Sequence, residues 1–324
     1  MNQAAQRTGR YSEQNFCAIP RPCAPCAQAS MVEISAFERY RALQNLQLAD
    51  AGLIILLHIP PTELLQPPLS AGHYLDALLA ETSLACKHLP DNPQLHQLHV
   101  YGDVALFSQQ QLQQLFAALR QHLQLPSNNF AWFSIGITPG HSSWAALGKL
   151  RDAGFNRITL NCNEPCFQAA ESLYDAARAL QFNTITMRAR YSPDGSGRLC
   201  PRLQAMARLQ PDRIVLEHAD ESLYDSPPDA ALVAYLKQAG YVQATHSCFV
   251  LPDDELTEYC DSLADNCISS SAHPVLGLGA GASSQLERLY FCNDSPLEPY
   301  IRTLAGNQLP PARGYRSESP SRPK

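Results

Sequence analysis

Residues 53–60 read Leu-Ile-Ile-Leu-Leu-His-Ile-Pro, and this stretch decides the fold. An apolar run without alternation is typical of a strand buried on both faces, as in a parallel sheet. It is the first of six short apolar runs, and a helical pattern follows each one. Repeated strand–helix units predict a parallel sheet covered by helices. We therefore expect an α/β fold, a partial six-stranded (β/α) barrel with a small C-terminal α/β extension.

The expected elements follow from these apolar runs. A helix is predicted over residues 32–48, and the last helix over 296–304. The chain is predicted to divide into an N-terminal Cys/Pro-rich arm and helix (1–48), the barrel (49–245), an extension with a Gly-rich segment (246–309) and a disordered tail (310–324). The six strands are expected at 53–59, 95–101, 131–137, 157–162, 184–189 and 213–217.

Composition excludes several classes of protein. The chain has 324 residues, 45% of them hydrophobic, and a formal net charge of −6. A chain of this length and composition is expected to form a sizeable hydrophobic core. Its net negative charge argues against a protein that binds nucleic acid through a basic face. No apolar run reaches the length of about eighteen residues that a membrane-spanning helix needs. The polar N-terminus lacks the apolar core of a signal peptide, so we expect a cytoplasmic protein.

The chain contains 11 cysteines. In a reducing compartment these are expected to be thiols or metal ligands rather than disulfides. Cys17, Cys23 and Cys26 form a Cys-x5-Cys-x2-Cys cluster. Three thiolates at this spacing could hold a [4Fe–4S] cluster with one open iron, or zinc with a fourth ligand from elsewhere. The alternative is an N-terminal arm that binds no metal.

Four stretches, at 57–60, 74–81, 147–157 and 276–284, carry a family resemblance. Among them, 276–284 reads Leu-Gly-Leu-Gly-Ala-Gly-Ala-Ser-Ser and is the most specific. Over roughly residues 53–304 the chain resembles the oxygen-independent coproporphyrinogen III oxidases and their haem chaperone and haem-utilisation relatives, all radical S-adenosylmethionine (SAM) proteins. The resemblance implies a partial barrel, a [4Fe–4S] cluster and SAM.

The departures from this family concern its chemistry. The family holds its cluster with Cys-x3-Cys-x2-Cys directly after the first strand, and those positions fall here on Thr62, Gln66 and Leu69. The family's Gly-Gly-Gly-Thr-Pro loop, which approaches SAM, is replaced by Val-Tyr-Gly-Asp-Val at 100–104. Core helices are thus retained while the cluster loop and the SAM loop are lost.

Several residues near predicted strand ends are candidates for ligand binding. His58 is interpreted either as a ligand or as a hydrogen-bonded histidine at the rim. Arg188 and Arg190 alternate and could bind a carboxylate such as a porphyrin propionate, or could pair with Glu217 or Asp103. The full set of predicted cofactor-binding residues is His58, Gly102, Asp103, Arg188, Arg190, Gly277, Gly279 and Gly281, the last three because they permit close approach of a ligand or another element.

Three functional hypotheses remain open. The first is a diverged coproporphyrinogen-oxidase-like protein that does not cleave SAM and keeps a binding or chaperone role in haem or porphyrin metabolism. The second is an active radical SAM oxidoreductase with its cluster on Cys17, Cys23 and Cys26. The third is a non-catalytic partner subunit of a family member. The expected cofactor is accordingly a [4Fe–4S] cluster together with SAM, or haem, or no cofactor. The expected ligand is a tetrapyrrole or another small molecule, and the third hypothesis adds a protein partner. None of the three hypotheses involves nucleic acid or a membrane.

Overall fold

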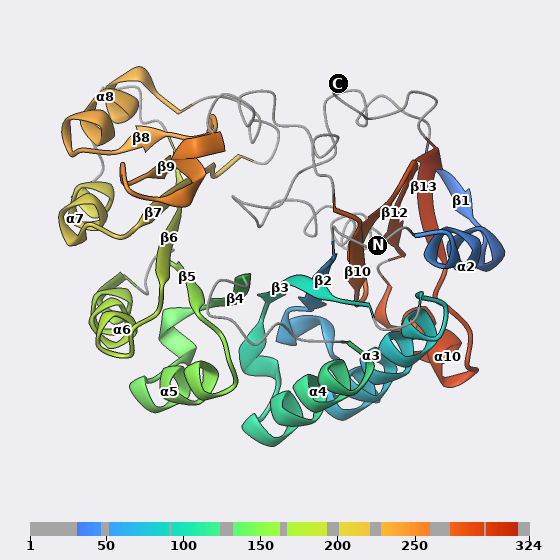
Figure 1. Ribbon diagram of the computed structural model, residues 1–324. Helices are drawn as coiled ribbons and strands as arrows, with labels where there is room; N and C mark the ends of the chain where they lie inside the picture. The colour runs from blue at the N-terminus through green and yellow to red at the C-terminus, as the bar shows by residue number, and fades with distance from the viewer. Residues whose placement is uncertain are drawn as a thin grey trace. The chain divides into compact units, whose positions relative to one another are not determined.

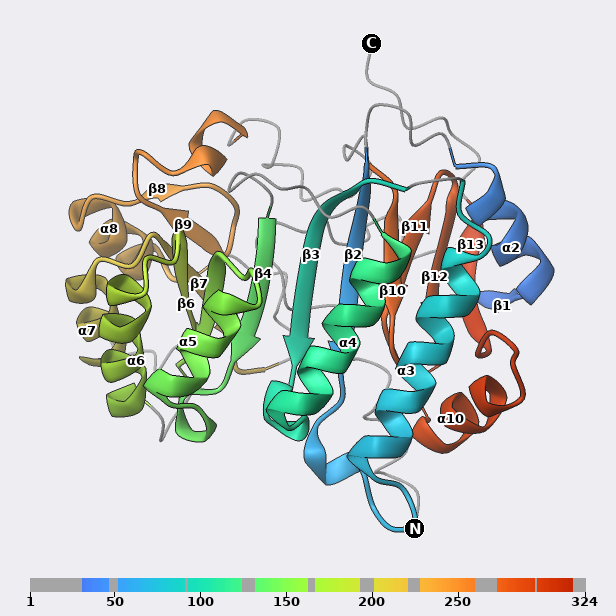
Figure 2. The same ribbon diagram turned by 60° about the horizontal axis from the view of Figure 1, so that its bottom comes forward.

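The structure is a computed structural model that describes residues 31–46, 52–90, 93–123, 132–162, 167–192, 201–220, 228–259, 273–294 and 296–316. The described chain falls into two compact units. The first contains residues up to 133 together with those from 273 onward, and the second contains residues 134–259, so that the boundary falls after the first two residues of β4 (Trp132–Ile137). Each unit is an α/β structure with a mixed sheet (Figures 1 and 2).

The first unit is organised around β2 (Leu53–Ile59), every residue of which is buried. β2 pairs in parallel with β3 (Leu95–Gly102) on one side and with β10 (Val275–Leu278) on the other. Antiparallel pairing then continues the sheet through β11 (Ser283–Leu286), β12 (Leu289–Asn293), β13 (Ala312–Arg316) and β1 (Val32–Ile34). The run at 53–60 is therefore central because it has a parallel neighbour on each edge.

Helices cover this sheet. α3 (Ala71–Cys86) packs against α4 (Gln109–His122) on one side and α10 (Leu297–Ala305) on the other, as Figure 2 shows. Serine side chains fix the helix starts: Ser70 accepts from the backbone of α3, and Ser108 forms a capping box with Gln111 at the start of α4. α2 (Ala36–Gln44) begins with the same device, built from Ser35 and Glu38.

The second unit repeats the strand–helix pattern. β4 (Trp132–Ile137), β5 (Arg157–Asn161), β6 (Thr184–Tyr191) and β7 (Arg213–His218) pair in parallel. α5 (Trp144–Asp152), α6 (Phe167–Ala179), α7 (Pro201–Leu209) and α8 (Ala230–Gln238) follow these strands in turn (Figure 1). β9 (Cys248–Val250) and β8 (Val242–Gln243) extend the sheet in antiparallel fashion beyond β7.

The six predicted strands are confirmed, with ends that shift by one or two residues, and a helix follows each of them as predicted. Two predictions about local structure are wrong. Residues 32–34 form β1 instead of opening the predicted helix, and residues 312–316 form β13 within the segment expected to be disordered. These two short strands pair with each other across nearly the whole sequence. Such long-range pairing stabilises segments whose local composition favours other states.

The C-terminal strands also take a place that the sequence did not indicate. The predicted extension supplies β10, which is hydrogen-bonded directly to β2. The strands and helix after residue 273 therefore complete the first unit's sheet. The predicted domain boundaries at residues 48, 245 and 309 stay a prediction.

Candidate functional site

The carboxyl ends of β10, β2 and β3 bring together predicted site residues of the first unit. In the register of the sheet, His58 of β2 lies opposite Tyr101 of β3, and Ile59 lies opposite Gly102. Gly279 directly follows β10, whose last residue, Leu278, lies opposite Leu57. Ligand sites in parallel sheets form at this end of the strands. This edge is therefore the candidate functional site of the first unit.

His58 is fixed in position through both its ring and its backbone. The ring Nδ1 lies 2.6 Å from the carbonyl oxygen of Ala280. The hydroxyl of Tyr74 donates to the carbonyl oxygen of His58 at 2.8 Å and accepts from the amide of Ala280 at 3.1 Å. Because a carbonyl can only accept, Nδ1 must carry the proton, and the neutral ring keeps its lone pair on Nε2.

The surroundings of His58 favour this neutral form. Burial lowers the pKa of His58 to about 4, although the hydrogen bond to Ala280 acts in the opposite direction. The ring of Tyr101 lies beside it, with 4.8 Å between the ring centroids. His58 is thus an uncharged imidazole of defined tautomer at neutral pH.

Glu81, which the sequence did not single out, holds the Gly-rich segment in place. It lies on α3 with only 1% of its surface exposed. Its carboxylate accepts from the amide of Gly279, the hydroxyl of Tyr300 and the side-chain amide of Asn293, each at 2.7 Å. A signal was present: Tyr74, Leu78 and Glu81 share the apolar face of the helix, so the acidic group points into the core.

Arg39 extends this network to α2. Its guanidinium donates to the side-chain oxygen of Asn293 at 2.9 Å and to the carbonyl oxygen of Pro310. The guanidinium carbon also lies 4.8 Å from the centre of the Phe291 ring. Burial lowers the pKa of Arg39, and Glu81 partly restores it. A carboxylate and a guanidinium thus share one buried set of hydrogen bonds behind the Gly-rich segment.

The predicted site glycines make close contacts between strands. A Cβ on Gly279 would lie 2.5 Å from the backbone oxygen of His58, and φ at Gly279 is +108°. A Cβ on Gly102 would meet the backbone of Ile59, and one on Gly277 would meet that of Ser283. Protein backbone therefore fills the space beside these three glycines. A role for Gly102, Gly277, Gly279 and Gly281 in binding a cofactor stays a prediction.

The predicted site residues of the second unit lie at the carboxyl ends of β6 and β7. Arg188 is buried and its Nε lies 3.5 Å from Glu217, while Arg190, with a side chain 40% exposed, lies 4.0 Å from the same carboxylate. The pairing with Glu217 that the sequence left as one alternative is therefore present. Arg190 keeps the more accessible guanidinium of the two.

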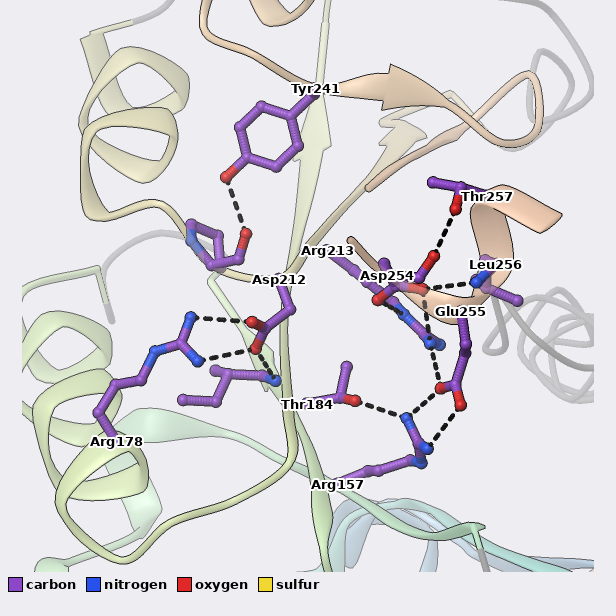
Figure 3. Close-up of polar contacts among 12 residues, drawn as sticks. Arg157, Arg178, Thr184, Asp212, Arg213, Tyr241, Asp254, Glu255, Leu256 and Thr257 are labelled. Carbon is purple, nitrogen blue, oxygen red and sulfur yellow. Dashed lines mark hydrogen bonds and ion pairs between the residues drawn. The ribbon is translucent and has the colours of Figure 1, made fainter. Parts of the chain in front are cut away.

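A second polar network, which sequence analysis did not identify, lies at the opposite, amino ends of β5, β6 and β7 (Figure 3). Arg213 binds Asp254 through two hydrogen bonds of 2.7 and 3.0 Å and Glu255 through one of 2.9 Å. Arg157 also binds Glu255 and Thr184. Its place, away from the carboxyl ends, is typical of a group that stabilises the fold.

Known proteins that are similar in sequence include enzymes of tetrapyrrole metabolism. The oxygen-independent coproporphyrinogen III oxidase of Pseudomonas aeruginosa is 27% identical over 341 residues, which cover 89% of this chain and 74% of that protein. Coproporphyrinogen III oxidase, anaerobic 1, of Cereibacter sphaeroides is 23% identical, and the match covers 75% of this chain but only 62% of that relative. No protein-family model matches the chain.

The fold agrees as well. Coproporphyrinogen III oxidase from Escherichia coli, a radical SAM enzyme, superposes with a TM-score of 0.73 at 20% identity, covering 88% of this chain and 76% of that one. The chain is therefore similar to the oxygen-independent coproporphyrinogen III oxidases over most of its length. The predicted α/β fold of radical SAM type is confirmed.

The loop after β2 differs from that of the family at the point where the family binds its cluster. It begins with a short 3-10 helix, η1 (Thr62–Leu64), and its last turn is closed by a hydrogen bond from the amide of Leu69 to the carbonyl of Gln66. The hydroxyl of Thr62 donates to Asp103 at 2.6 Å. Thr62, Gln66 and Leu69 offer no thiolate, which an iron–sulfur cluster requires. The loop therefore does not fit the cluster.

The Thr62–Asp103 hydrogen bond holds this loop against the end of β3, and its contribution to the free energy of unfolding can be measured. Replacing Thr62 by Val is expected to cost about 0.5–1 kcal/mol in the free energy of unfolding, because the bond is strong but exposed. A cycle with Asp103→Ala and the double variant, measured by urea denaturation, should give a coupling energy of that size. A coupling energy near zero would show that the loop is not held in this way.

The predicted metal ligands Cys17, Cys23 and Cys26 lie outside the described residues. Within the described part of the chain, no group of three or more His, Cys, Asp or Glu could hold a metal ion. Cys86, Cys162 and Cys292 are reduced thiols as expected, but Cys248 is disulfide-bonded, so the prediction that disulfides are absent is wrong. Sequence spacing does not show which thiols come within bonding distance. None of the described helices is long and apolar enough to cross a membrane.

Proposed function

We propose that this chain is a diverged coproporphyrinogen III oxidase-like protein that binds a tetrapyrrole and does not cleave SAM. One observation carries this proposal. The loop after β2 has Thr62, Gln66 and Leu69 at the family's ligand positions, and Thr62 is bonded to Asp103. A reaction that begins at an iron–sulfur cluster cannot start from this loop, because oxygen and amide groups do not replace thiolates on such a cluster.

Support for a tetrapyrrole comes from the relatives and from charge. The relatives are named for coproporphyrinogen III, a carboxylate-bearing tetrapyrrole. Arg190 has a side chain 40% exposed at the carboxyl end of β6, and its guanidinium can bind a carboxylate through charge-assisted hydrogen bonds. In a binding or chaperone role, the protein would bind the tetrapyrrole without carrying out the radical SAM reaction.

The test measures cluster and tetrapyrrole separately. The full chain is purified without oxygen, incubated with iron and sulfide, and analysed for iron per chain and for SAM cleavage. We expect neither a four-iron cluster nor SAM cleavage. A cluster that disappears in Cys23→Ala, together with SAM cleavage, would overturn the proposal in favour of the active enzyme.

The second arm titrates metal-free coproporphyrin and follows its fluorescence. Arg190→Ala is expected to weaken binding about tenfold, since one charge-assisted hydrogen bond is worth about 1.5–3 kcal/mol. Arg208→Ala, an exposed arginine of α7 in the same unit, is the matched control and should bind like the wild type. A chain that binds neither cluster nor porphyrin would contradict the proposal and favour the partner-subunit hypothesis.

A further inference from the structure

The orientation of His58 carries an inference that rests on the proposed function and deepens it. We propose that Nε2 of His58 is an axial ligand for the iron of a bound haem. The site is the carboxyl end of β2, and the ligand class is a metallated tetrapyrrole as distinct from a metal-free one. Three observations about the first unit support this assignment.

The first observation is the tautomer. Nδ1 of His58 is 2.6 Å from the carbonyl oxygen of Ala280, so the proton lies on Nδ1 and the lone pair on Nε2. Histidines that bind a metal through one ring nitrogen almost always donate the other N–H to a carbonyl, carboxylate or water. His58 already has this arrangement. Its neutral form is further favoured by burial, which lowers the pKa to about 4.

The second observation is rigidity. Tyr74 donates to the His58 carbonyl at 2.8 Å and accepts from the Ala280 amide at 3.1 Å, so one hydroxyl joins the strand end to the residue that orients the ring. The amide of Gly279 in turn donates to Glu81. Both the imidazole and its hydrogen-bond acceptor are therefore held before any ligand binds, which reduces the entropy cost of coordination.

The third observation concerns the number of ligands. A bare metal ion needs several protein ligands, and the described residues contain no group of three or more that could supply them. Haem brings its own four nitrogens and needs only an axial side chain. Nε2 makes no hydrogen bond among the described residues, and His58 as a whole is 8% exposed. A single fixed imidazole is thus suited to haem and insufficient for a lone ion.

His58→Asn is the decisive variant. The asparagine amide can still donate to the Ala280 carbonyl, so the tether is kept while the coordinating nitrogen is lost. Titration of the full chain with ferric haem, followed at the Soret band, is expected to show a changed spectrum and at least tenfold weaker binding, because replacing even an outer-shell partner of a metal ligand costs about 10–100-fold. Metal-free coproporphyrin should bind both proteins equally. His73→Ala, a histidine of α3 bonded only to Ser70 in the described chain, is the matched control.

The outcomes separate the two proposals. If His58→Asn binds ferric haem with the affinity and spectrum of the wild type, His58 is only a tether and the inference fails, while porphyrin binding would leave the proposed function standing. If neither macrocycle binds, both fail. Should the variant not fold, resonance Raman spectroscopy of the wild-type ferrous complex decides: an iron–histidine band that shifts with ¹⁵N-histidine labelling is expected, and its absence would overturn the assignment.

Discussion

Replacing Glu81 with alanine is expected to destabilise the first unit by about 3–5 kcal/mol. The substitution leaves the Gly279 amide, the Asn293 amide and the Tyr300 hydroxyl without the acceptor they share. It also removes the negative charge that partly offsets burial of Arg39. A loss of this size is a large part of the 5–15 kcal/mol that typically separates folded and unfolded states. Urea denaturation followed by circular dichroism measures it.

The matched control lies on the same helix. Asp76 is an exposed carboxylate of α3, and Asp76→Ala should change stability by no more than about 0.5 kcal/mol. Glu81→Gln should fall between the two, because the amide keeps one acceptor and most of the volume. If Glu81→Ala behaved like Asp76→Ala, the buried network would not be holding the Gly-rich segment.

The pH dependence of the Glu81 effect has a definite sign. Burial raises the pKa of Glu81 above its ordinary value, although its hydrogen bonds and Arg39 act against this. The folded state therefore binds the proton more tightly than the unfolded state. The corresponding stability is fully present below about pH 4.5 and is lost as pH rises through the folded pKa. The advantage of wild type over Glu81→Gln should thus shrink as pH rises, and an advantage that grows would contradict the raised pKa.

Much of this fold could be predicted because its signals are local. The apolar runs beginning at 53 and 95 each end where a polar residue or glycine meets the loop, and Ser70 and Ser108 then cap the next helix. A residue that caps a helix, and an apolar run that forms a strand, each determine the structure of the few residues around them. Reading the sequence therefore recovers the repeating strand–helix order and hence the fold class.

The errors arise from contacts that are distant in sequence. The apolar spacing at residues 34, 37 and 40 is helical, yet Val32–Ile34 becomes a strand because Ala312–Arg316 offers it a partner. The composition around Gly314 is typical of a disordered tail. Gly314 has no side chain, however, and therefore fits closely against Tyr290 and Phe291 of β12. The local sequence of each segment therefore does not predict that the other segment pairs with it.

The candidate site could be predicted only in part for a related reason. His58, Gly102 and Gly279 were found because strand ends and glycines are visible in the sequence. Glu81 was not, although it occupies the apolar face of its helix, because its partners Gly279, Asn293 and Tyr300 come from 198 to 219 positions away. A charge on an apolar helix face is the sequence signal that such a network leaves.

Replacing Asp254 with alanine is expected to cost about 3–5 kcal/mol in the second unit. The side chains of Arg213 and Asp254 are both 5% exposed and are joined by two hydrogen bonds (Figure 3). Without Asp254, the buried guanidinium of Arg213 loses two hydrogen bonds and keeps the one to Glu255, which also binds Arg157. Asp253→Ala, at the exposed neighbouring position, is the control and should stay within about 0.5 kcal/mol of wild type.

A double replacement distinguishes the cost of an unpaired charge from the value of the pair. Arg213→Met combined with Asp254→Leu removes both charges together and fills similar volume, so it should be much closer in stability to wild type than either single variant. Denaturation midpoints of the four proteins give this comparison directly. If the double variant instead loses the sum of the two single effects, the coupling energy is zero, and the two side chains stabilise the fold independently of their pairing. Arg157, Thr184 and Arg213 begin three adjacent strands, so a large coupling energy would show that the pairing with Asp254 acts where those strands start.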